Sequence, residues 1–127
     1  MADQKTKLLT VDDEADIVGL FKDHFELKNY EVFTATRAEE GLQIALKEKP
    51  RIILLDLGLP DHPGSWVLEN VKKTLPDTLV VILSASVDDD RIREKLTKLG
   101  CDLILEKDQN TSIAEVGRQV EALVAGA

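Results

Sequence analysis

Short apolar runs alternate with amphipathic stretches five times along this chain of 127 residues, and that alternation restricts its fold more than any other feature. Each apolar run is followed by a stretch in which apolar residues recur at helical spacing. Strands that are apolar on both faces and separated by helices are typical of a parallel sheet covered on both sides. The expected strands are residues 8–11, 30–33, 52–55, 79–83 and 103–105.

Five such units favour an α/β fold with a doubly wound, five-stranded parallel sheet in the strand order 2-1-3-4-5. The pattern runs without a linker, so we expect a single domain over residues 1–127 with a core from about 7 to 124. In this order the second strand is an edge and the other four strands are contiguous. A shared site is therefore expected at the carboxyl ends of strands one, three, four and five.

The helical stretches carry apolar faces and start signals of their own. Ile17, Leu20 and Phe21 are expected to face the core from the first helix, and Leu42 and Leu46 from the second. Two capping boxes are predicted, at Thr36 with Glu39 and at Ser112 with Glu115.

Composition excludes several classes of function. With 24 acidic and 16 basic residues the net charge is −8, and the basic residues are scattered, which disfavours a direct contact with nucleic acid. Cys101 is the only cysteine, so neither an internal disulfide nor a thiolate metal site is available. The chain has no apolar signal region and no run of membrane-spanning length, so a cytoplasmic protein is expected.

Polar residues stand at the end of each of the four contiguous strands. Asp12 and Asp13 follow the first, Asp56 ends the third, Ser84 follows the fourth and Lys107 ends the fifth. Taken singly, each has an ordinary explanation as a helix-start acid, a turn residue, a cap or a solvated charge. Their occurrence at one end of adjacent strands is hard to attribute to capping, and it predicts a shared site.

The charges of this set indicate a chemistry. Three carboxylates and one ammonium leave the cluster at about −2, which a hard divalent cation such as Mg²⁺ would neutralise. Asp56 is central among the contributing strands and is the best candidate for a nucleophile that forms an acyl phosphate. Lys107 and the Ser84 hydroxyl are placed to hold phosphoryl oxygens, while Asp12 and Asp13 would hold the metal directly or through water.

These motifs together resemble the receiver domain of two-component response regulators, and the resemblance spans residues 7 to about 124. It is carried by Leu9-Thr-Val-Asp12-Asp13-Glu14, by Asp56-Leu-Gly-Leu-Pro60 with Gly64 eight residues after the aspartate, by Leu83-Ser84-Ala85, and by Gly100 before Lys107.

The resemblance implies a CheY-like fold in which Asp56 accepts a phosphoryl group from a histidine kinase or phosphotransfer protein. It also implies that Asp13, Asp56 and the backbone carbonyl of Gly58 hold Mg²⁺, that Asp12 acts through water, and that Ser84 and Lys107 sense the phosphate. A receiver hydrolyses its own acyl phosphate, so a signalling module rather than a turnover enzyme is expected.

For the same family, output is expected through protein contact with an unknown effector, or through a phosphorylation-dependent dimer on the fourth helix, fifth strand and fifth helix. The alternative is a receiver-fold interaction module that acts without phosphorylation. The chain is also compatible with a receiver excised from a longer protein.

Three positions depart from the family pattern. Asp108 follows Lys107 where the family usually has Pro after a cis bond; a cis bond without Pro costs about 2.5–4 kcal/mol, and both the cis and the trans forms stay open. Ile104 replaces the aromatic residue that many receivers use as a mobile latch, and it is expected simply to fill the strand. Ser84 replaces the commoner Thr and keeps the hydroxyl.

Neither histidine is expected to bind a metal. His24 lies near the apolar face of the first helix and is predicted to pack there, whereas His62 lies in the loop after Asp56 and is predicted to be solvated. Trp66, near the same loop, is interpreted as a packing residue.

Overall fold

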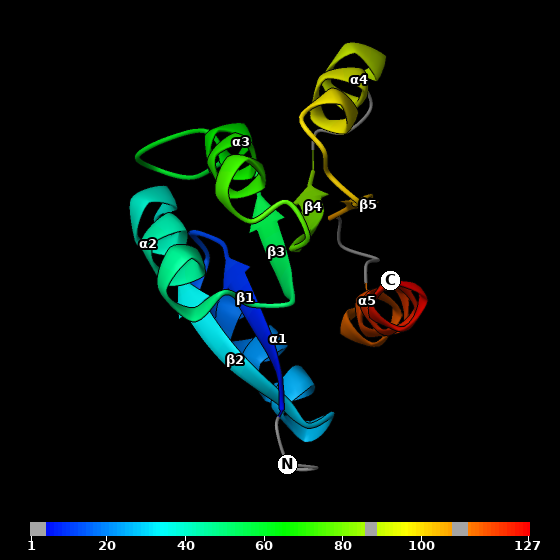
Figure 1. Cartoon of the computed structure of the whole chain (residues 1–127). Helices are drawn as coiled ribbons and strands as arrows, with labels where there is room; N and C mark the ends of the chain where they lie inside the picture. Colours follow the sequence, from blue (N-terminus) through cyan, green and yellow to red (C-terminus); the bar gives the residue numbers. More distant parts are fainter. Residues whose placement is uncertain (1–4, 86–88, 108–111) are drawn as a thin grey trace.

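A five-stranded parallel sheet lies between two layers of helices in the computed structural model, which describes residues 5–85, 89–107 and 112–127 (Figure 1). The strands are β1 (Thr6–Val11), β2 (Tyr30–Ala35), β3 (Ile52–Asp56), β4 (Leu79–Ser84) and β5 (Leu103–Glu106). The helices are α1 (Ala15–Leu27), α2 (Ala38–Glu48), α3 (Gly64–Thr74), α4 (Asp90–Lys98) and α5 (Ile113–Gly126). The sheet order β2-β1-β3-β4-β5 confirms the predicted topology.

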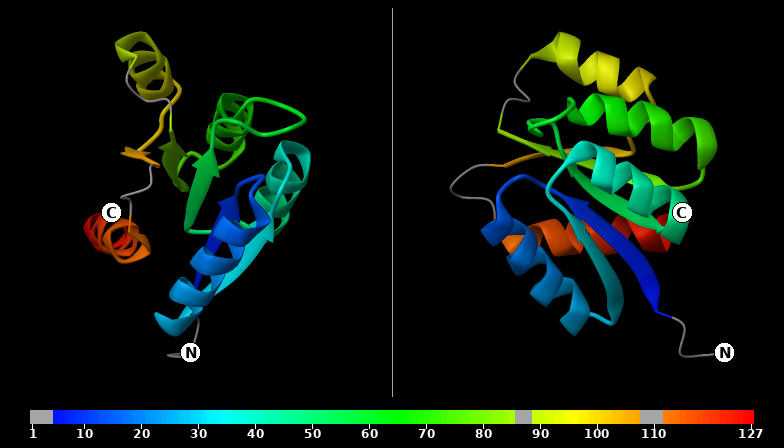
Figure 2. Two further views of the ribbon diagram at one scale, coloured as in Figure 1. Left: turned by 180° about the vertical axis from the view of Figure 1, so that it is seen from behind. Right: turned by 90° about the vertical axis from the view of Figure 1, so that its left-hand side faces the viewer.

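The alternation of side chains along the central strands builds two separate cores. In β3, Ile53 and Leu55 face the core formed with α2, α3 and α4, whereas Ile52 and Leu54 face the core formed with α1 and α5. All four side chains are almost completely buried, which explains why this strand is apolar throughout. Figure 2 shows the two helix layers on opposite sides of the sheet.

The predicted inner faces of two helices were partly wrong. Leu20 and Leu46 were expected to face inward, yet they are 49% and 39% exposed. In α1 the buried face is centred on Val18 and Phe21, and at about 100° per residue Leu20 points well away from it. In α2 the buried residues are the small ones, Ala38, Gly41 and Ala45. At Gly41 the helix lies so close to β1 that a Cβ there would stand 2.8 Å from a Val11 methyl carbon.

The two predicted capping boxes had different outcomes. Ser112 caps α5 as expected, since its hydroxyl accepts a hydrogen bond from the Glu115 backbone N–H at 2.9 Å. The box at Thr36 and Glu39 was wrong. The backbone N–H of Thr36 donates to the Glu40 carboxylate instead, at 3.1 Å, because α2 begins one residue later than that box requires.

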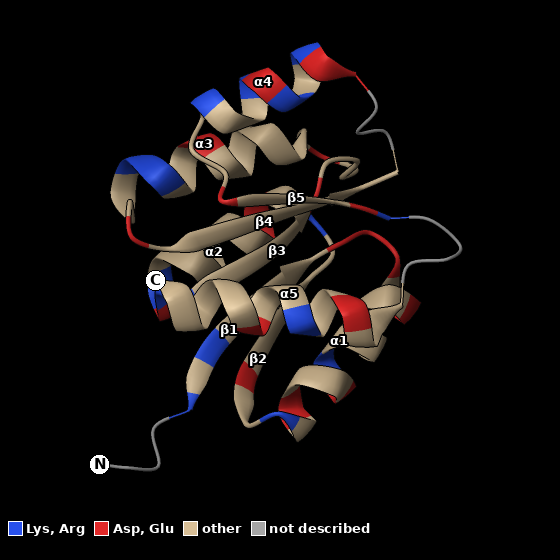
Figure 3. Ribbon diagram, turned by 90° about the vertical axis from the view of Figure 1, so that its right-hand side faces the viewer, with Lys and Arg blue, Asp and Glu red and all other residues tan. Residues whose placement is uncertain are grey.

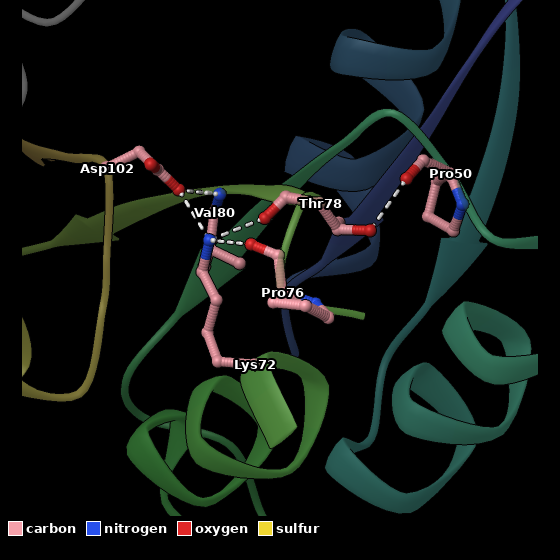
Figure 4. Close-up of polar contacts among 6 residues, drawn as sticks. All are labelled: Pro50, Lys72, Pro76, Thr78, Val80 and Asp102. Atoms are coloured by element: carbon pink, nitrogen blue, oxygen red, sulfur yellow. Dashed lines mark hydrogen bonds and ion pairs between the residues drawn. The ribbon is translucent and has the colours of Figure 1, made fainter. Parts of the chain in front are cut away.

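A closed polar network holds α3 to the amino ends of β4 and β5 (Figure 4). The Lys72 ammonium donates to the carbonyl of Thr78 at 2.6 Å, to the carbonyl of Pro76 at 3.4 Å and to the Asp102 carboxylate at 3.0 Å. Asp102 also accepts from the Val80 backbone N–H at 2.8 Å. One cation and one anion therefore satisfy each other together with the backbone groups around them.

The β5 side of the molecule is covered more thinly than the centre. Leu96 is the only buried side chain of α4, and the apolar residues of β5 are only partly buried. Ile104 packs against the core on the α3 and α4 side, as expected of a residue that fills the strand. Acidic and basic positions are interspersed along α4 (Figure 3).

Within the described ranges, no helix combines the length and apolarity needed to cross a membrane.

Candidate functional site

The sheet register brings the ends of four strands together. β1 pairs with β3 through Val11 and Leu55, so that Asp12 follows β1 beside the point where β3 ends in Asp56. Asp56 is aligned with Leu83 of β4, and the next residue, Ser84, is aligned with Glu106 of β5. The predicted residues therefore lie along one edge of the sheet, because strand ends in a parallel sheet meet at the same edge.

Asp12 is the most firmly held acid of the group and is almost completely buried. One carboxylate oxygen accepts from the backbone N–H of Glu14 at 2.9 Å, and the other accepts from the Lys107 ammonium at 2.6 Å. Its backbone N–H donates to the carbonyl of Ala35 at 3.1 Å. The edge strand β2, which was expected to leave the site alone, therefore contributes a backbone oxygen that anchors it.

The carboxylates of Asp12, Asp13 and Asp56 converge. Each offers an oxygen, and the three oxygens lie within 4.8 Å of one another. Asp13 is exposed, whereas the Asp56 side chain is 12% exposed. Burying like charges at this spacing is unfavourable unless a cation compensates them.

The surroundings of Asp56 raise its pKa, even with Lys107 nearby. Burial raises this pKa above its usual value, and the neighbouring charges of Asp12 and Asp13 raise it further. The Lys107 ammonium and a hydrogen bond from the Gly58 backbone act in the opposite direction without cancelling the rise. The carboxylate is thus destabilised as an anion until another positive charge reaches it.

Lys107 follows β5 and lies among three acids. Its ammonium is 2.6 Å from Asp12, 3.2 Å from Glu14 and 3.8 Å from Asp56. Burial lowers the pKa of Lys107, but these acidic neighbours outweigh burial and raise it above its usual value, which keeps the side chain positively charged. Its backbone N–H donates to the carbonyl of Ser84 at 2.9 Å, so β4 fixes the start of the loop.

Ser84 and the loop after Asp56 complete the edge of the site. Ser84 is the last residue of β4 and is buried. Gly64 begins α3 so close to Asp56 that a Cβ there would stand 2.3 Å from the Asp56 carbonyl oxygen, which explains the glycine eight residues after the aspartate. Asp108 belongs to residues 108–111, outside the described part of the chain, and so does the geometry of the bond that precedes it.

Asp61, in the loop between β3 and α3, has a role that sequence reasoning missed. Its two carboxylate oxygens accept from the backbone N–H groups of Ala38 and Glu39, at 2.7 and 2.9 Å, and so cap α2 from a distant loop. The pKa of Asp61 is lowered by these hydrogen bonds. A carboxylate 23 residues from the helix that it caps leaves no local signal in the sequence.

The neighbouring His62 was expected to be solvated; its side chain is 34% exposed, and it also makes two contacts that were not expected. Its ring stacks on Trp66, with centroids 4.0 Å apart, and its Nε2 lies 3.2 Å from the Glu39 carboxylate. His24 packs as predicted, edge-on to Phe25. The loop that carries Gly58 is thus tied to α2 by Asp61 and His62 together.

The donor set fits a magnesium ion on chemical grounds. Three converging carboxylates with one ammonium nearby leave an excess of negative charge at a partly open edge. Oxygen ligands with room for water are what Mg²⁺ prefers, whereas Zn²⁺ sites usually contain His or Cys. The acidic group can therefore bind a hard divalent cation, and it contains the three acids predicted to do so.

Comparison with known proteins places these features in a family. The family model of the response regulator receiver domain matches residues 8–116. Sporulation initiation phosphotransferase F of Bacillus subtilis is 33% identical over 88 residues, which cover 69% of this chain and 71% of that protein. The alkaline phosphatase synthesis transcriptional regulatory protein PhoP of the same organism is 34% identical over 119 residues, or 93% of this chain and 48% of PhoP.

Solved structures agree with this comparison at the level of the fold. A CheY-like response regulator receiver domain protein from Methanospirillum hungatei superposes with a TM-score of 0.90 at 23% identity, covering 97% of this chain and 96% of that one. The chain spans only about a third of the length of some curated relatives, such as the probable transcriptional regulator ycf27 of Porphyra purpurea, of which it covers 35% at 38% identity.

Proposed function

Because this chain belongs to the response regulator receiver domain family, we propose that Asp56 is the residue that accepts a phosphoryl group from a histidine kinase or a phosphotransfer protein. The observation that carries the proposal is the position of Asp56. It ends β3 beside Asp12 and Asp13, with the Lys107 ammonium 3.8 Å from its carboxylate. A carboxylate so placed has two further acids beside it that could bind a cation, and a lysine ammonium close to it.

In the proposed reaction a carboxylate oxygen of Asp56 attacks the phosphorus of the donor. A bond forms between that oxygen and phosphorus while the phosphorus–nitrogen bond of a phosphohistidine breaks, and the imidazole leaves and takes up a proton. The product is an acyl phosphate on Asp56. Lys107 and the Ser84 hydroxyl would hold the phosphoryl oxygens through charge-assisted hydrogen bonds, so the protein acts mainly by positioning and electrostatics.

Magnesium is part of the proposal. Asp12, Asp13, Asp56 and the backbone carbonyl of Gly58 would hold it, in keeping with the convergence of the three carboxylates. When bound, Mg²⁺ would supply the positive charge that allows an anionic phosphoryl group to approach Asp56. Burial and the charge of Asp12 raise the pKa of Asp56, and a nearby cation would act against both by favouring the carboxylate anion.

In this proposal the protein is a signalling module and not a turnover enzyme, because the phosphoryl acceptor is its own side chain and the acyl phosphate is expected to hydrolyse. Its output would pass to an effector protein, or to a second copy through α4, β5 and α5. The thin covering of β5 and the single buried residue of α4 support that choice of surface. The cytoplasmic location expected from the sequence remains a prediction, which cell fractionation tests.

Acetyl phosphate tests the phosphoacceptor role without any partner. Incubated with Mg²⁺ and acetyl phosphate, the protein should gain one phosphoryl group and release acetate, as intact-mass spectrometry would show, whereas Asp56→Asn should gain none. No addition to the unmodified protein would favour the alternative, an interaction module that acts without phosphorylation. Equal addition to both proteins would place the phosphoryl group elsewhere.

A further inference from the structure

Glu14 is the acid near the site that the proposed reaction does not use, and it contacts Lys107. Its carboxylate accepts a hydrogen bond from the Lys107 ammonium at 3.2 Å. Asp56, the residue that Lys107 is expected to serve, is farther from the ammonium, at 3.8 Å, and beyond hydrogen-bond distance. Lys107 is thus hydrogen-bonded to the loop after β1, and not to the proposed phosphoacceptor.

The backbone on both sides of Glu14 is fixed, which defines where its side chain can reach. Its backbone N–H donates to the Asp12 carboxylate at 2.9 Å, and its carbonyl accepts from Ile17 and Val18 at the start of α1. The Glu14 side chain makes no capping hydrogen bond to that helix. Its contact with Lys107 is therefore additional to the local structure, and substitution of Glu14 removes that contact without removing a cap.

The two hydrogen-bonding acids of Lys107 differ in what their loss would cost. Asp12 is buried and belongs to the group predicted to bind the metal, whereas the Glu14 side chain is 61% exposed and can be solvated by water. A phosphoryl oxygen on Asp56 would need a hydrogen bond from the Lys107 ammonium, which already donates to Asp12 and Glu14. Glu14 is the acceptor that would compete with this oxygen for the ammonium, and it does not belong to the acids expected to hold the metal.

From this geometry we propose that Glu14 is a positioning residue. It holds Lys107 in the position that the lysine has while Asp56 is unphosphorylated, and so slows phosphorylation of Asp56. The inference rests on the proposed phosphoacceptor function. An exposed ion pair changes an equilibrium constant only modestly, so release of Lys107 should accelerate phosphorylation about two- to fivefold.

The test compares Glu14→Ala with Asp16→Ala. Both substitutions remove one exposed negative charge at the start of α1, but only Glu14 contacts Lys107. The rate of phosphorylation by acetyl phosphate with saturating Mg²⁺ is measured by intact-mass spectrometry. Glu14→Ala should be about two- to fivefold faster than the unmodified protein, Glu14→Gln intermediate, and Asp16→Ala unchanged, with the same thermal midpoint for all three variants.

A second background shows whether Glu14 acts through Lys107. In Lys107→Met, which has no ammonium to restrain, the further change Glu14→Ala should leave the rate as it is in Lys107→Met. Equal rates for Glu14→Ala and the unmodified protein, or equal acceleration by Asp16→Ala, would overturn the inference while leaving the phosphoacceptor role intact. Failure of every protein to gain a phosphoryl group would instead refute the phosphoacceptor role itself.

Discussion

Lys72 and Lys107 lie at opposite ends of the same sheet with nearly equal side-chain exposure, 16% and 19%, and both are paired with aspartates. At the amino end, Lys72 and Asp102 neutralise each other. Lys72 also donates to a backbone carbonyl, and Asp102 accepts from a backbone N–H (Figure 4). At the carboxyl end, Lys107 faces Asp12, Glu14 and Asp56 together.

The comparison shows that a partly buried lysine does not by itself mark a functional site. What separates the two ends is whether the charges balance. At the amino end one cation meets one anion, whereas the carboxyl end keeps an excess of acid that a bound cation would neutralise. Four experiments would show whether the two ends differ in this way.

Magnesium should have the largest effect, and only at the carboxyl end. A ligand at a hundred times its Kd stabilises a protein by about 2.7 kcal/mol, and Mg²⁺ should raise the free energy of unfolding to that extent. Urea unfolding with and without Mg²⁺ measures the gain. Lys72→Met should keep the gain and Asp13→Asn should lose most of it; a full gain in Asp13→Asn would show that the ion binds elsewhere.

Removal of the amino-end lysine should be the next largest effect. Lys72→Met leaves the Asp102 carboxylate and the Thr78 carbonyl without their charged partner, and we expect a loss of about 2 kcal/mol in the free energy of unfolding. Lys73→Met is the matched control, because the adjacent Lys73 side chain is 70% exposed and should matter little. Similar losses for the two variants would contradict a structural role for the network.

Removal of an acid at the carboxyl end should instead stabilise the protein. Asp56→Asn relieves the burial and repulsion that raise the pKa of Asp56, and without metal we expect a gain on the order of 1 kcal/mol at neutral pH. Because this pKa is raised on folding, the folded protein binds the proton more tightly than the unfolded chain.

The sign of the pH dependence follows from that difference. Stability should fall as the pH rises from the ordinary aspartate value, about 3.9, through the raised folded value, and the penalty should then stay constant. Asp56→Asn should lack this contribution to the slope. Urea titrations of both proteins in chelator would show it, and a loss of stability in Asp56→Asn would contradict the charge excess.

Substitution of Asp61 should change the stability of the protein least. It should lower that stability, whereas Asp56→Asn should raise it. Asp61 lies at the same end of the sheet as Asp56, but its carboxylate oxygens accept hydrogen bonds from the backbone N–H groups of Ala38 and Glu39. Asp61→Ala should therefore lower the thermal midpoint. Since the pKa of Asp61 is lowered on folding, its contribution should be present above the ordinary value and be lost as the pH falls through the folded value. A rise in the midpoint would contradict a stabilising role for the cap that Asp61 provides to α2.

The sequence predicted the site residues that stand at strand ends, but it did not predict the contacts between residues that are distant in the chain. Asp12, Asp13 and Asp56 could be placed together because apolar strands must stop where a carboxylate begins, and the order of the strands then aligns their ends. The cap that Asp61 provides to α2 could not be predicted, since it joins residues that are remote in sequence. The contact of Glu14 with Lys107 was missed for the same reason.

The faces of the helices were predicted less well than the site. Leu20 and Leu46 fit an apolar spacing, but apolar residues fall on more than one side of these short helices, and only tertiary packing selects the buried side. In α2 the selected side is the one with Gly41, because close approach to Val11 requires a small residue.

Locating the phosphoryl group shows whether Asp56 is the residue that accepts it. After reaction with acetyl phosphate and Mg²⁺, borohydride reduces an aspartyl phosphate to homoserine, and tandem mass spectrometry of the peptides identifies the altered position. Unmodified protein and Lys72→Met should both carry homoserine at position 56 alone. Homoserine in place of Asp12, Asp13 or Asp61, or none at any position, would contradict the claim that the charge excess at the carboxyl end makes Asp56 the phosphoacceptor.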